Sequence, residues 1–342
     1  MKTLALLLVS VPALVAQAPQ SDIRNAKLEV RPFSGDWTST LRSGPPAWFG
    51  YAVKTIRKDS ENCCWNGNGR GGCGLEGNWT DGSIGTRPNT PVQLEGSDTA
   101  AVLLRVENNA VGKVHLYSLH CPLDAGGLPF IWLNGVSNTA SIAYLKTLAA
   151  SDSNHVADGA IFAISQHAGV EADAVLADLA KPQQPERVRE KVAFWLGASR
   201  EAPGVVMLKN MLANDPSSKV RDKAVFALSV SKQPEALDEL IRAAKSDSSA
   251  HVRGQAIFWL AQKAGKQAAS TIKDAVENDP DTEVKKRAVF ALSQLPKDEG
   301  IPKLIEIART QRNPEARKQA FFWLGQSQDP RALAFFQEIL SK

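Results

Sequence analysis

Four cysteines are the residues of this chain whose type and spacing could do chemistry. They are Cys63, Cys64, Cys73 and Cys121. Their thiolates could bind zinc, with His120 as a further ligand, or form a redox pair. There is no Cys-x-x-Cys, adjacent ligands suit tetrahedral zinc poorly, and an even count in a loop-rich region of an exported chain favours disulfides. A bond between neighbouring cysteines would be strained, so we expect one of Cys63 and Cys64 to join Cys73 and the other to join Cys121.

No other set of residues forms a catalytic pattern. The five histidines are scattered, and the sequence has no Gly-x-Ser-x-Gly, no phosphate-binding glycine loop and no convincing nucleophile and base. His155 and His251 each directly precede a similar valine-led segment, at Val156 and Val252, where a surface or cap role is expected. We therefore expect a protein that is not an enzyme, with no catalytic residue, no metal site and no cofactor.

The region that holds the cysteines, residues 19–137, has the pattern of a small β domain. Runs of β-forming residues predict strands at 27–31, 48–53, 101–106, 113–118 and 128–133. We expect a small disulfide-stabilised antiparallel sheet followed by a helix at 141–149. Residues 59–90 are rich in glycine and asparagine and predict a loop.

The first 18 residues predict a secretory signal peptide. Lys2 precedes an apolar run at 4–16, and Ala16-Gln17-Ala18 is a small-x-small cleavage pattern. The run is too short to span a membrane, and no later segment approaches that length. We expect cleavage after Ala18, no transmembrane segment in the mature chain, and a periplasmic or secreted location.

The remaining residues, 138–342, repeat every 32 residues. The pattern of Val220-Arg-Asp-Lys-Ala-Val-Phe-Ala-Leu-Ser229 begins, without insertion or deletion, at Val156, Val188, Val220, Val252, Val284 and Ala316. Six copies in fixed register predict an array of similar helix pairs, in which each pair buries the next. The β domain is expected to cover the N-terminal end of this stack.

Aromatic residues in the first helix of each pair predict how neighbouring pairs pack. A phenylalanine occurs six residues after each anchor, and the next position alternates between alanine and tryptophan. This alternation indicates that an indole fills the space beside the alanine of a neighbour, and helical register places the tryptophans toward the core. A ligand track is the less favoured reading. The expected packing residues are Phe162, Phe194, Trp195, Phe226, Phe258, Trp259, Phe290, Phe322 and Trp323.

The second helix of each pair carries one polar position two residues after an apolar column. If this column is exposed, it forms a candidate surface for a protein or peptide partner, although plain solvation explains any single member equally well. The column consists of Asp178, Asn210, Arg242, Asp274, Glu306 and Glu338.

The motif Asp-Pro-x-x-x-Val-Arg-x-x-Ala-x-x-Ala-Leu resembles the HEAT repeat, in the short form found in bilin-lyase-like proteins. The resemblance covers about 139–342 and implies a right-handed α-solenoid of six helix pairs, with the second helices lining the concave side. It also implies a ladder of Asp and Arg between units. Lys285 replaces the arginine in the fifth unit and Gln311 the aspartate in the sixth, so the ladder should be partial. Some HEAT-like proteins are di-iron hydroxylases with His-Glu dipeptides, and this sequence has none.

Together these features favour a non-catalytic protein-interaction scaffold of the bacterial cell envelope. The formal net charge is +4, with 40 Lys and Arg against 36 Asp and Glu and no basic run, so a nucleic-acid partner is not expected. The alternative places the activity in the β domain, as small-ligand binding or as a bilin-lyase-like or hydrolytic enzyme, with the repeats as a docking handle.

Overall fold

The computed structural model describes residues 22–56, 63–66, 69–70, 73–77 and 98–341. The chain divides into two compact units. One contains the β region, helix α2 (Asn138–Ala149) up to residue 148, and residues 153–163; the other contains residues 149–152 and 164–342. The predicted signal peptide lies outside the described residues. Within them, none of the helices combines the length and the apolar character needed to cross a membrane.

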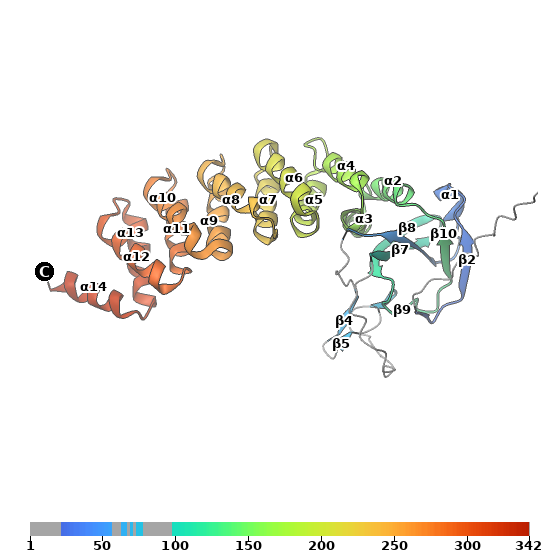
Figure 1. The fold of residues 1–342 in the computed structure, drawn as a ribbon, viewed down its shortest axis with the longest axis horizontal. Coiled ribbons are helices and arrows are strands. Elements are labelled where there is room, and N and C mark those ends of the chain that lie inside the picture. The colour runs from blue at the N-terminus through green and yellow to red at the C-terminus, as the bar shows by residue number, and fades with distance from the viewer. Residues whose placement is uncertain (1–21, 57–62, 67–68, 71–72, 78–97, 342) are drawn as a thin grey trace, which may run out of the picture. The chain divides into compact units, whose positions relative to one another are not determined.

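The β unit is built on a five-stranded sheet. Its strands, in spatial order, are β2 (Leu28–Pro32), β10 (Phe130–Asn134), β3 (Ala47–Lys54), β7 (Thr99–Glu107) and β8 (Ala110–Ser118). All five match predicted strands (Figure 1). Strands β7 and β8 are joined at Asn108 and Asn109, which both have positive φ, as a tight hairpin turn requires.

The sheet is mixed, so the prediction of an antiparallel sheet was wrong. Strand β10 runs parallel to both β2 and β3, while β3, β7 and β8 are antiparallel. Strands β2 and β3 point the same way because the chain between them crosses over through α1 (Trp37–Thr40) and leaves a gap of one strand. Strand β10 fills that gap after a long connection, and no local sequence signal fixes the direction of such a strand.

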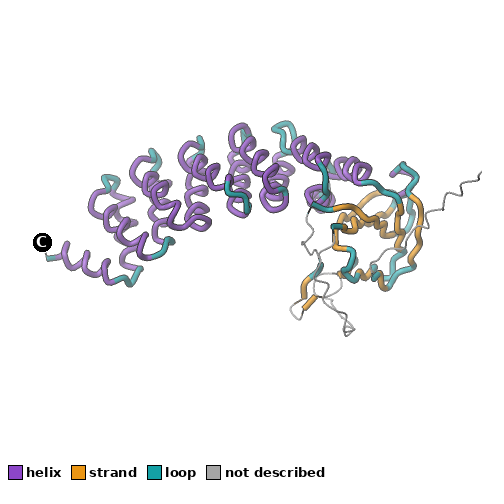
Figure 2. The backbone as a smooth tube through the Cα atoms, viewed as in Figure 1, coloured by secondary structure: helices purple, strands orange, loops and turns teal. Residues whose placement is uncertain are grey.

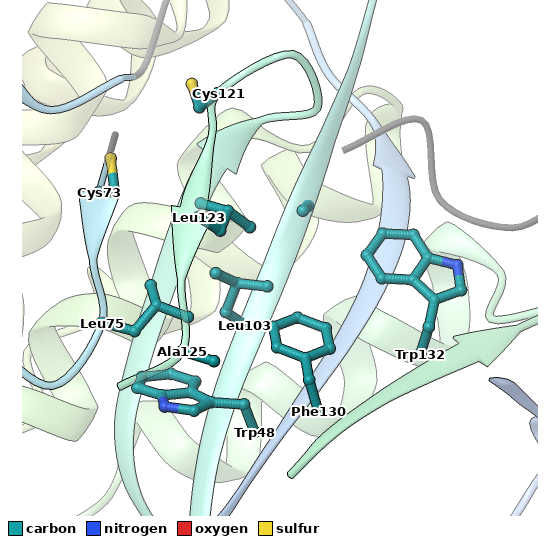
Figure 3. Close-up of a cluster of buried hydrophobic side chains, with 10 residues drawn as sticks. Trp48, Cys73, Leu75, Leu103, Cys121, Leu123, Ala125, Phe130 and Trp132 are labelled. Carbon is teal, nitrogen blue, oxygen red and sulfur yellow. The ribbon is translucent and has the colours of Figure 1, made fainter. Parts of the chain in front are cut away.

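Each face of this sheet is covered, which explains the continuous apolar run in β7. On one face, Trp48, Leu103 and Phe130 pack with Leu75 and Leu123, which belong to the segments around β6 (Cys73–Gly74) and β9 (Leu123–Asp124) (Figure 3). Strands β6 and β9 form a second sheet with β1 (Ile23–Arg24). The core of the unit therefore lies between two sheets.

Two helices cover the opposite face. The Tyr51 hydroxyl lies 3.0 Å from the Ser141 hydroxyl of α2, and the indole of Trp37 stacks on Tyr144 of the same helix. Gly159 of α3 (Asn154–Gln166) lies so close to the sheet that an added Cβ would come within 2.3 Å of the Val114 carbonyl oxygen. Burial raises the pKa of the Tyr51 and Tyr144 phenols, that of Tyr144 to about 12. The sheet therefore packs on α2 and α3 within this unit, while its role as a cap of the repeats stays a prediction.

The segment predicted as a loop at 59–90 is described only in part, and the described parts include short strands. Strand β4 (Trp65–Asn66) pairs with β5 (Gly69–Arg70), and β6 pairs in parallel with β9. The expectation of an irregular segment is therefore corrected there. Disulfides and pairing with β9 supply long-range constraints that the glycine-rich composition does not reveal.

Helix pairs make up the remaining chain, as predicted (Figure 2). After α3 come α4 (Val170–Leu179), α5 (Glu186–Ser199), α6 (Glu201–Asn214), α7 (Ser218–Val230), α8 (Glu235–Ser246), α9 (Ala250–Ala264), a 3-10 turn at Gly265–Ala268, α10 (Ala269–Asn278), α11 (Thr282–Ser293), α12 (Lys297–Thr310), α13 (Pro314–Gln326) and α14 (Pro330–Leu340). From α5 onward, each first helix packs on the next first helix.

The repeated apolar positions form the core of this array. Val220, Ala224 and Leu228 on α7 are completely buried, and so is the second-helix column at Leu208, Leu240, Ile272 and Leu304. At roughly 25 cal/mol per Å² of apolar surface removed from water, each buried leucine stabilises the stack by about 1.5–3 kcal/mol. The apolar residues that recur every 32 positions in the sequence are therefore the residues that are buried in each helix pair.

Candidate partner-binding surface

Buried ion pairs hold consecutive helix pairs in register. Arg189 donates to Asp215 at 2.7 and 3.1 Å, and Arg253 donates to Asp279 at 2.7 and 3.0 Å. The side chains of Arg189 and Asp215 are only 6% and 1% exposed. Hydrogen bonding to Asp279 raises the pKa of Arg253, so the guanidinium stays charged. The expected ladder is confirmed, and it joins each first helix to the turn that follows the second helix of its pair.

The ladder ends where its residues change. Lys285 donates to the carbonyl oxygens of Val276 and Glu277, at 2.9 and 2.6 Å, and makes no bidentate pair. Gln311 accepts from the Asn313 N–H, as the aspartates accept at their own turns, but its amide nitrogen donates to the Val276 carbonyl at 2.8 Å. The expected partial character of the ladder is therefore confirmed.

The six predicted column residues lie at equivalent positions on α4, α6, α8, α10, α12 and α14. Asn210, Arg242, Asp274 and Glu306 are exposed, and Asp178 and Glu338 are half-buried. The structure therefore brings them to one face of the second helices, which we call the second-helix face. Their role in partner binding stays a prediction.

Several column residues are engaged in ion pairs along this face. Glu306 accepts from Lys273 of α10 at 2.6 Å, Glu338 pairs with Arg309 of α12, and Arg242 donates to Glu239 at 2.8 Å. Asp178 pairs with Lys181 at 2.8 Å. The Glu239 carboxylate is only 9% exposed, whereas the other pairs are more open to solvent and contribute about 0–1 kcal/mol each.

Asn210 and Asp274 differ from the other column residues. Each accepts a side-chain amide hydrogen bond at 2.7 Å from an asparagine four residues later, Asn214 and Asn278 respectively. A hydrogen bond within one helix leaves the outward side of each group exposed. These two positions are therefore the best places to probe the second-helix face.

The aromatic residues of the first helices form an unbroken chain of ring contacts. Successive ring centroids lie 4.8–6.3 Å apart, in the order Trp195, Phe194, Phe226, Trp259, Phe258, Phe290, Trp323 and Phe322. Trp259 and Trp323 contact the phenylalanine of the preceding pair, beside a fully buried alanine (Ala227 or Ala291). The expected contact between neighbours is present in these two cases. Phe162 lies at the equivalent position of α3.

The tryptophans are less buried than predicted. Trp195, Trp259 and Trp323 are half-buried, and Phe322 is 52% exposed. The helix turns its alanine and valine stripe inward, so the bulky ring at the next position reaches only the boundary between core and solvent. The indoles therefore face the core, as the register predicts, but they are only partly buried by it.

The four cysteines form two disulfides, Cys63 with Cys121 and Cys64 with Cys73. The first bond joins Cys63 to a residue two positions before β9, and the second joins Cys64 to the first residue of β6. The Cys63 and Cys121 sulfurs and a His120 nitrogen lie within 4.8 Å of one another. Because both sulfurs are joined in a disulfide, neither is available as a thiolate ligand in this oxidation state.

A polar cluster in the β unit was not identified from the sequence. The Glu76 carboxylate accepts from the Trp48 indole at 3.0 Å and from Arg105 at 2.8 Å. Nearby, His115 lies between the rings of Trp48 and Tyr117, and burial lowers the pKa of its imidazole. The sequence does indicate that His115 and Tyr117, two residues apart on β8, lie on the same face of the strand. It does not indicate that Trp48 of β3 is the ring that His115 contacts.

The profile of the HEAT-repeat family matches residues 205–293 and 269–342. No curated protein matches the chain. Kap95p in complex with RanGDP is a similar solved structure, with 18% identity and a TM-score of 0.41 over 60% of this chain and 32% of that chain. The CpcE and CpcF complex of phycocyanin lyase from Nostoc has 18% identity and a TM-score of 0.31 over 57% of this chain and 79% of that chain. Human deoxyhypusine hydroxylase has 17% identity and a TM-score of 0.32 over 58% of this chain and 89% of that chain. Residues 205–342, with their repeated helix pairs and their Arg–Asp ladder, are HEAT repeats.

Proposed function

We propose that this chain is a non-catalytic protein-interaction scaffold of the bacterial cell envelope, which binds a protein or peptide partner on the second-helix face. The observation that carries the proposal is the uninterrupted series of helix pairs, which repeats one polar position from α4 to α14 and exposes it on α6, α8, α10 and α12. Repeat arrays present extended surfaces of this kind. Export to the periplasm follows from the predicted signal peptide and is part of the proposal.

The charge pattern supports a partner with both signs of charge. Asp274 and Glu306 are acidic, while Arg242 and Lys209 are basic, and all four lie on second helices. Arg242 has a 57% exposed side chain, and Lys209 has a 53% exposed one. A partner with an alternating charge pattern could replace the weak pairs now made along this face.

Photo-crosslinking tests the surface directly in the exporting cell. A photoreactive residue is placed at Asn210 or Asp274, and the matched control positions are Lys219 and Glu283 on the first helices, whose side chains are 76% and 71% exposed. The expected result is an adduct of one defined mass from the first two positions and none from the controls. A double charge reversal, Arg242→Glu with Asp274→Lys, should abolish it.

The alternative, activity in the β unit, gives a different result in the same experiment. A photoreactive residue at the exposed Glu107 of β7 reports on that unit. Adducts from Glu107 alone, or adducts from Asn210 that survive the double charge reversal, would rule out the second-helix face as the binding surface.

A further inference from the structure

Lys263 caps the end of a helix in the preceding pair. Its ammonium group, in the last turn of α9, donates to the carbonyl oxygens of Ser229 and Ser231 at 3.0 and 2.5 Å. These carbonyls belong to the C-terminal end of α7, where the helix dipole and unpaired carbonyl groups favour a cation. Burial lowers the pKa of Lys263, as expected for an ammonium group that has left water.

The same carbonyl positions are capped by a cation two repeats earlier. Ser165 and His167, at the end of α3, precede Ser229 and Ser231 by 64 residues, which is two repeats of 32. Their carbonyl oxygens accept hydrogen bonds of 3.2 and 2.7 Å from the Arg200 guanidinium, which is only 1% exposed. Two different cationic side chains therefore occupy equivalent sites, each at the C-terminal end of a tryptophan-bearing helix.

The third equivalent site, two repeats later, has no cation of its own. Ser293 and Leu295 at the end of α11 correspond to Ser229 and Ser231, and Ser327 stands where Lys263 stands. Within the described part of the chain, no side chain and no backbone N–H donates to the carbonyl oxygen of Ser293 or Leu295. A pocket of about 200 Å³ lies here, lined by Ser293, Leu295 and Ser327 among others.

The other walls of the pocket suit an aliphatic chain with a polar end. Leu292, Ile301, Leu304 and Trp323 provide apolar walls. The indole Nε1 of Trp323 is buried and has no hydrogen-bond partner among the described residues. Lys297, at the exposed rim, is the charged residue of the lining. No carboxylate lines the pocket, so carbonyl oxygens must supply the recognition of a cation.

We propose that this pocket binds a primary ammonium group on a short aliphatic stem, held as the Lys263 ammonium is held in the equivalent site. The stem lies along Ile301 and Leu304, and the ammonium donates to the carbonyls of Ser293 and Leu295. An acceptor at the other end of the ligand, such as a carboxylate, meets the exposed ammonium group of Lys297 at the rim. The ammonium group belongs either to a free amine or to a lysine side chain of a partner.

Thermal unfolding of the full chain with n-butylammonium, which reproduces the Lys263 side chain, tests the site. Saturating n-butylammonium should raise the Tm by about 3 °C, and n-butanol at the same concentration should not. A lower Kd for Nα-acetyl-lysine methylamide than for n-butylammonium assigns the group to a partner's lysine, and the reverse order assigns it to a free amine. Equal effects of n-butylammonium and n-butanol would overturn the proposal.

Ser327→Lys converts the pocket into a copy of the Lys263 site. The tethered ammonium should raise the Tm and remove the response to n-butylammonium, whereas Ser327→Ala should keep the response. The reverse change, Lys263→Ala, should lower the Tm, and n-butylammonium should restore part of the loss by chemical rescue. Lys263→Met, which keeps the stem but not the charge, controls for packing.

The rescue experiment keeps the proposal testable if Ser327→Lys does not fold. An unchanged response to n-butylammonium in Ser327→Lys, or a failure of n-butylammonium to rescue Lys263→Ala, would show that these carbonyl ends do not select ammonium groups.

Discussion

Arg221 of α7 forms a bidentate ion pair with Asp247, which lies in the turn between α8 and the next helix pair. The two hydrogen bonds measure 2.9 and 3.1 Å, and the side chains are 10% and 4% exposed. Arg221 also donates to the Asp215 carbonyl at 2.9 Å, so one guanidinium joins three segments of the stack. Hydrogen bonding to Asp247 raises the pKa of Arg221.

Arg221→Leu should lower the free energy of unfolding of the repeats by about 3–5 kcal/mol, because it leaves the Asp247 carboxylate buried without a partner. Guanidinium denaturation of the full chain, followed by far-ultraviolet circular dichroism, measures this loss. Lys219→Leu is the matched control, since its pair with Glu186 is exposed and should contribute less than about 1 kcal/mol. Equal losses in the two variants would contradict a structural role for the buried ladder.

Restoring the missing rung should stabilise the junction of the fifth and sixth helix pairs. Lys285→Arg together with Gln311→Asp recreates the pair that Arg253 and Asp279 form one repeat earlier. Gln311→Asp alone should destabilise, because Lys285 already donates to two carbonyls. A double-mutant cycle should give a coupling energy of about 1–3 kcal/mol. Additive effects of the two substitutions on the free energy of unfolding would mean that the new arginine and aspartate do not form an ion pair.

The two disulfides should differ in their contribution to stability. Cys63–Cys121 closes a sequence separation of 58 residues, and Cys64–Cys73 closes one of 9. In the chain-entropy account, these loops correspond to about 4 and about 3 kcal/mol respectively. The paired substitution Cys63→Ala with Cys121→Ala should therefore lower the Tm of the β unit more than Cys64→Ala with Cys73→Ala. The opposite order in calorimetry would show that enthalpic effects at the loop dominate.

The β unit should lose stability in mild acid because of His115. Burial lowers the pKa of this imidazole in the folded state, so the unfolded chain binds the proton more tightly. Stability is then complete above the unfolded value of about 6.5 and decreases as the pH falls toward the lowered folded pKa. Urea midpoints at pH 7.5 and 5.5 measure this decrease. His115→Phe keeps an aromatic ring beside Trp48 and should flatten the profile; an unchanged slope would assign the acid sensitivity to other groups.

The repeats could be predicted from the sequence because the hydrophobic pattern of each helix is local and recurs every 32 residues. Val220, Ala224 and Leu228 predict a buried stripe through the geometry of one helix, and the 32-residue period transfers that stripe to every pair. Lys285 and Gln311 stand where other repeats have arginine and aspartate, and these two changes likewise predict where the ladder stops. The column from Asp178 to Glu338 follows from the same register, although register alone does not name a partner.

The β unit shows what a single sequence does not determine. Strand β10 was predicted as a strand, but its insertion between β2 and β3 depends on contacts with residues such as Leu28 and Trp48, which precede Phe130 by about 80 to 100 positions. The selection of Cys121 by Cys63 rather than by Cys64 depends on the path of the folded chain. The contact of His115 with Trp48 has the same origin.

By itself, the sequence determined the helix pairs, their period and the residues that bury them, because hydrophobic periodicity and turn residues act within a few residues of one another. Only the tertiary structure decided the direction of β10, the half-exposed position of Trp259, and the carbonyls that Lys263 and Arg200 reach. Each of these depends on which distant backbone atoms lie beside a side chain after packing, and the free energy of such contacts belongs to pairs of segments rather than to either segment alone.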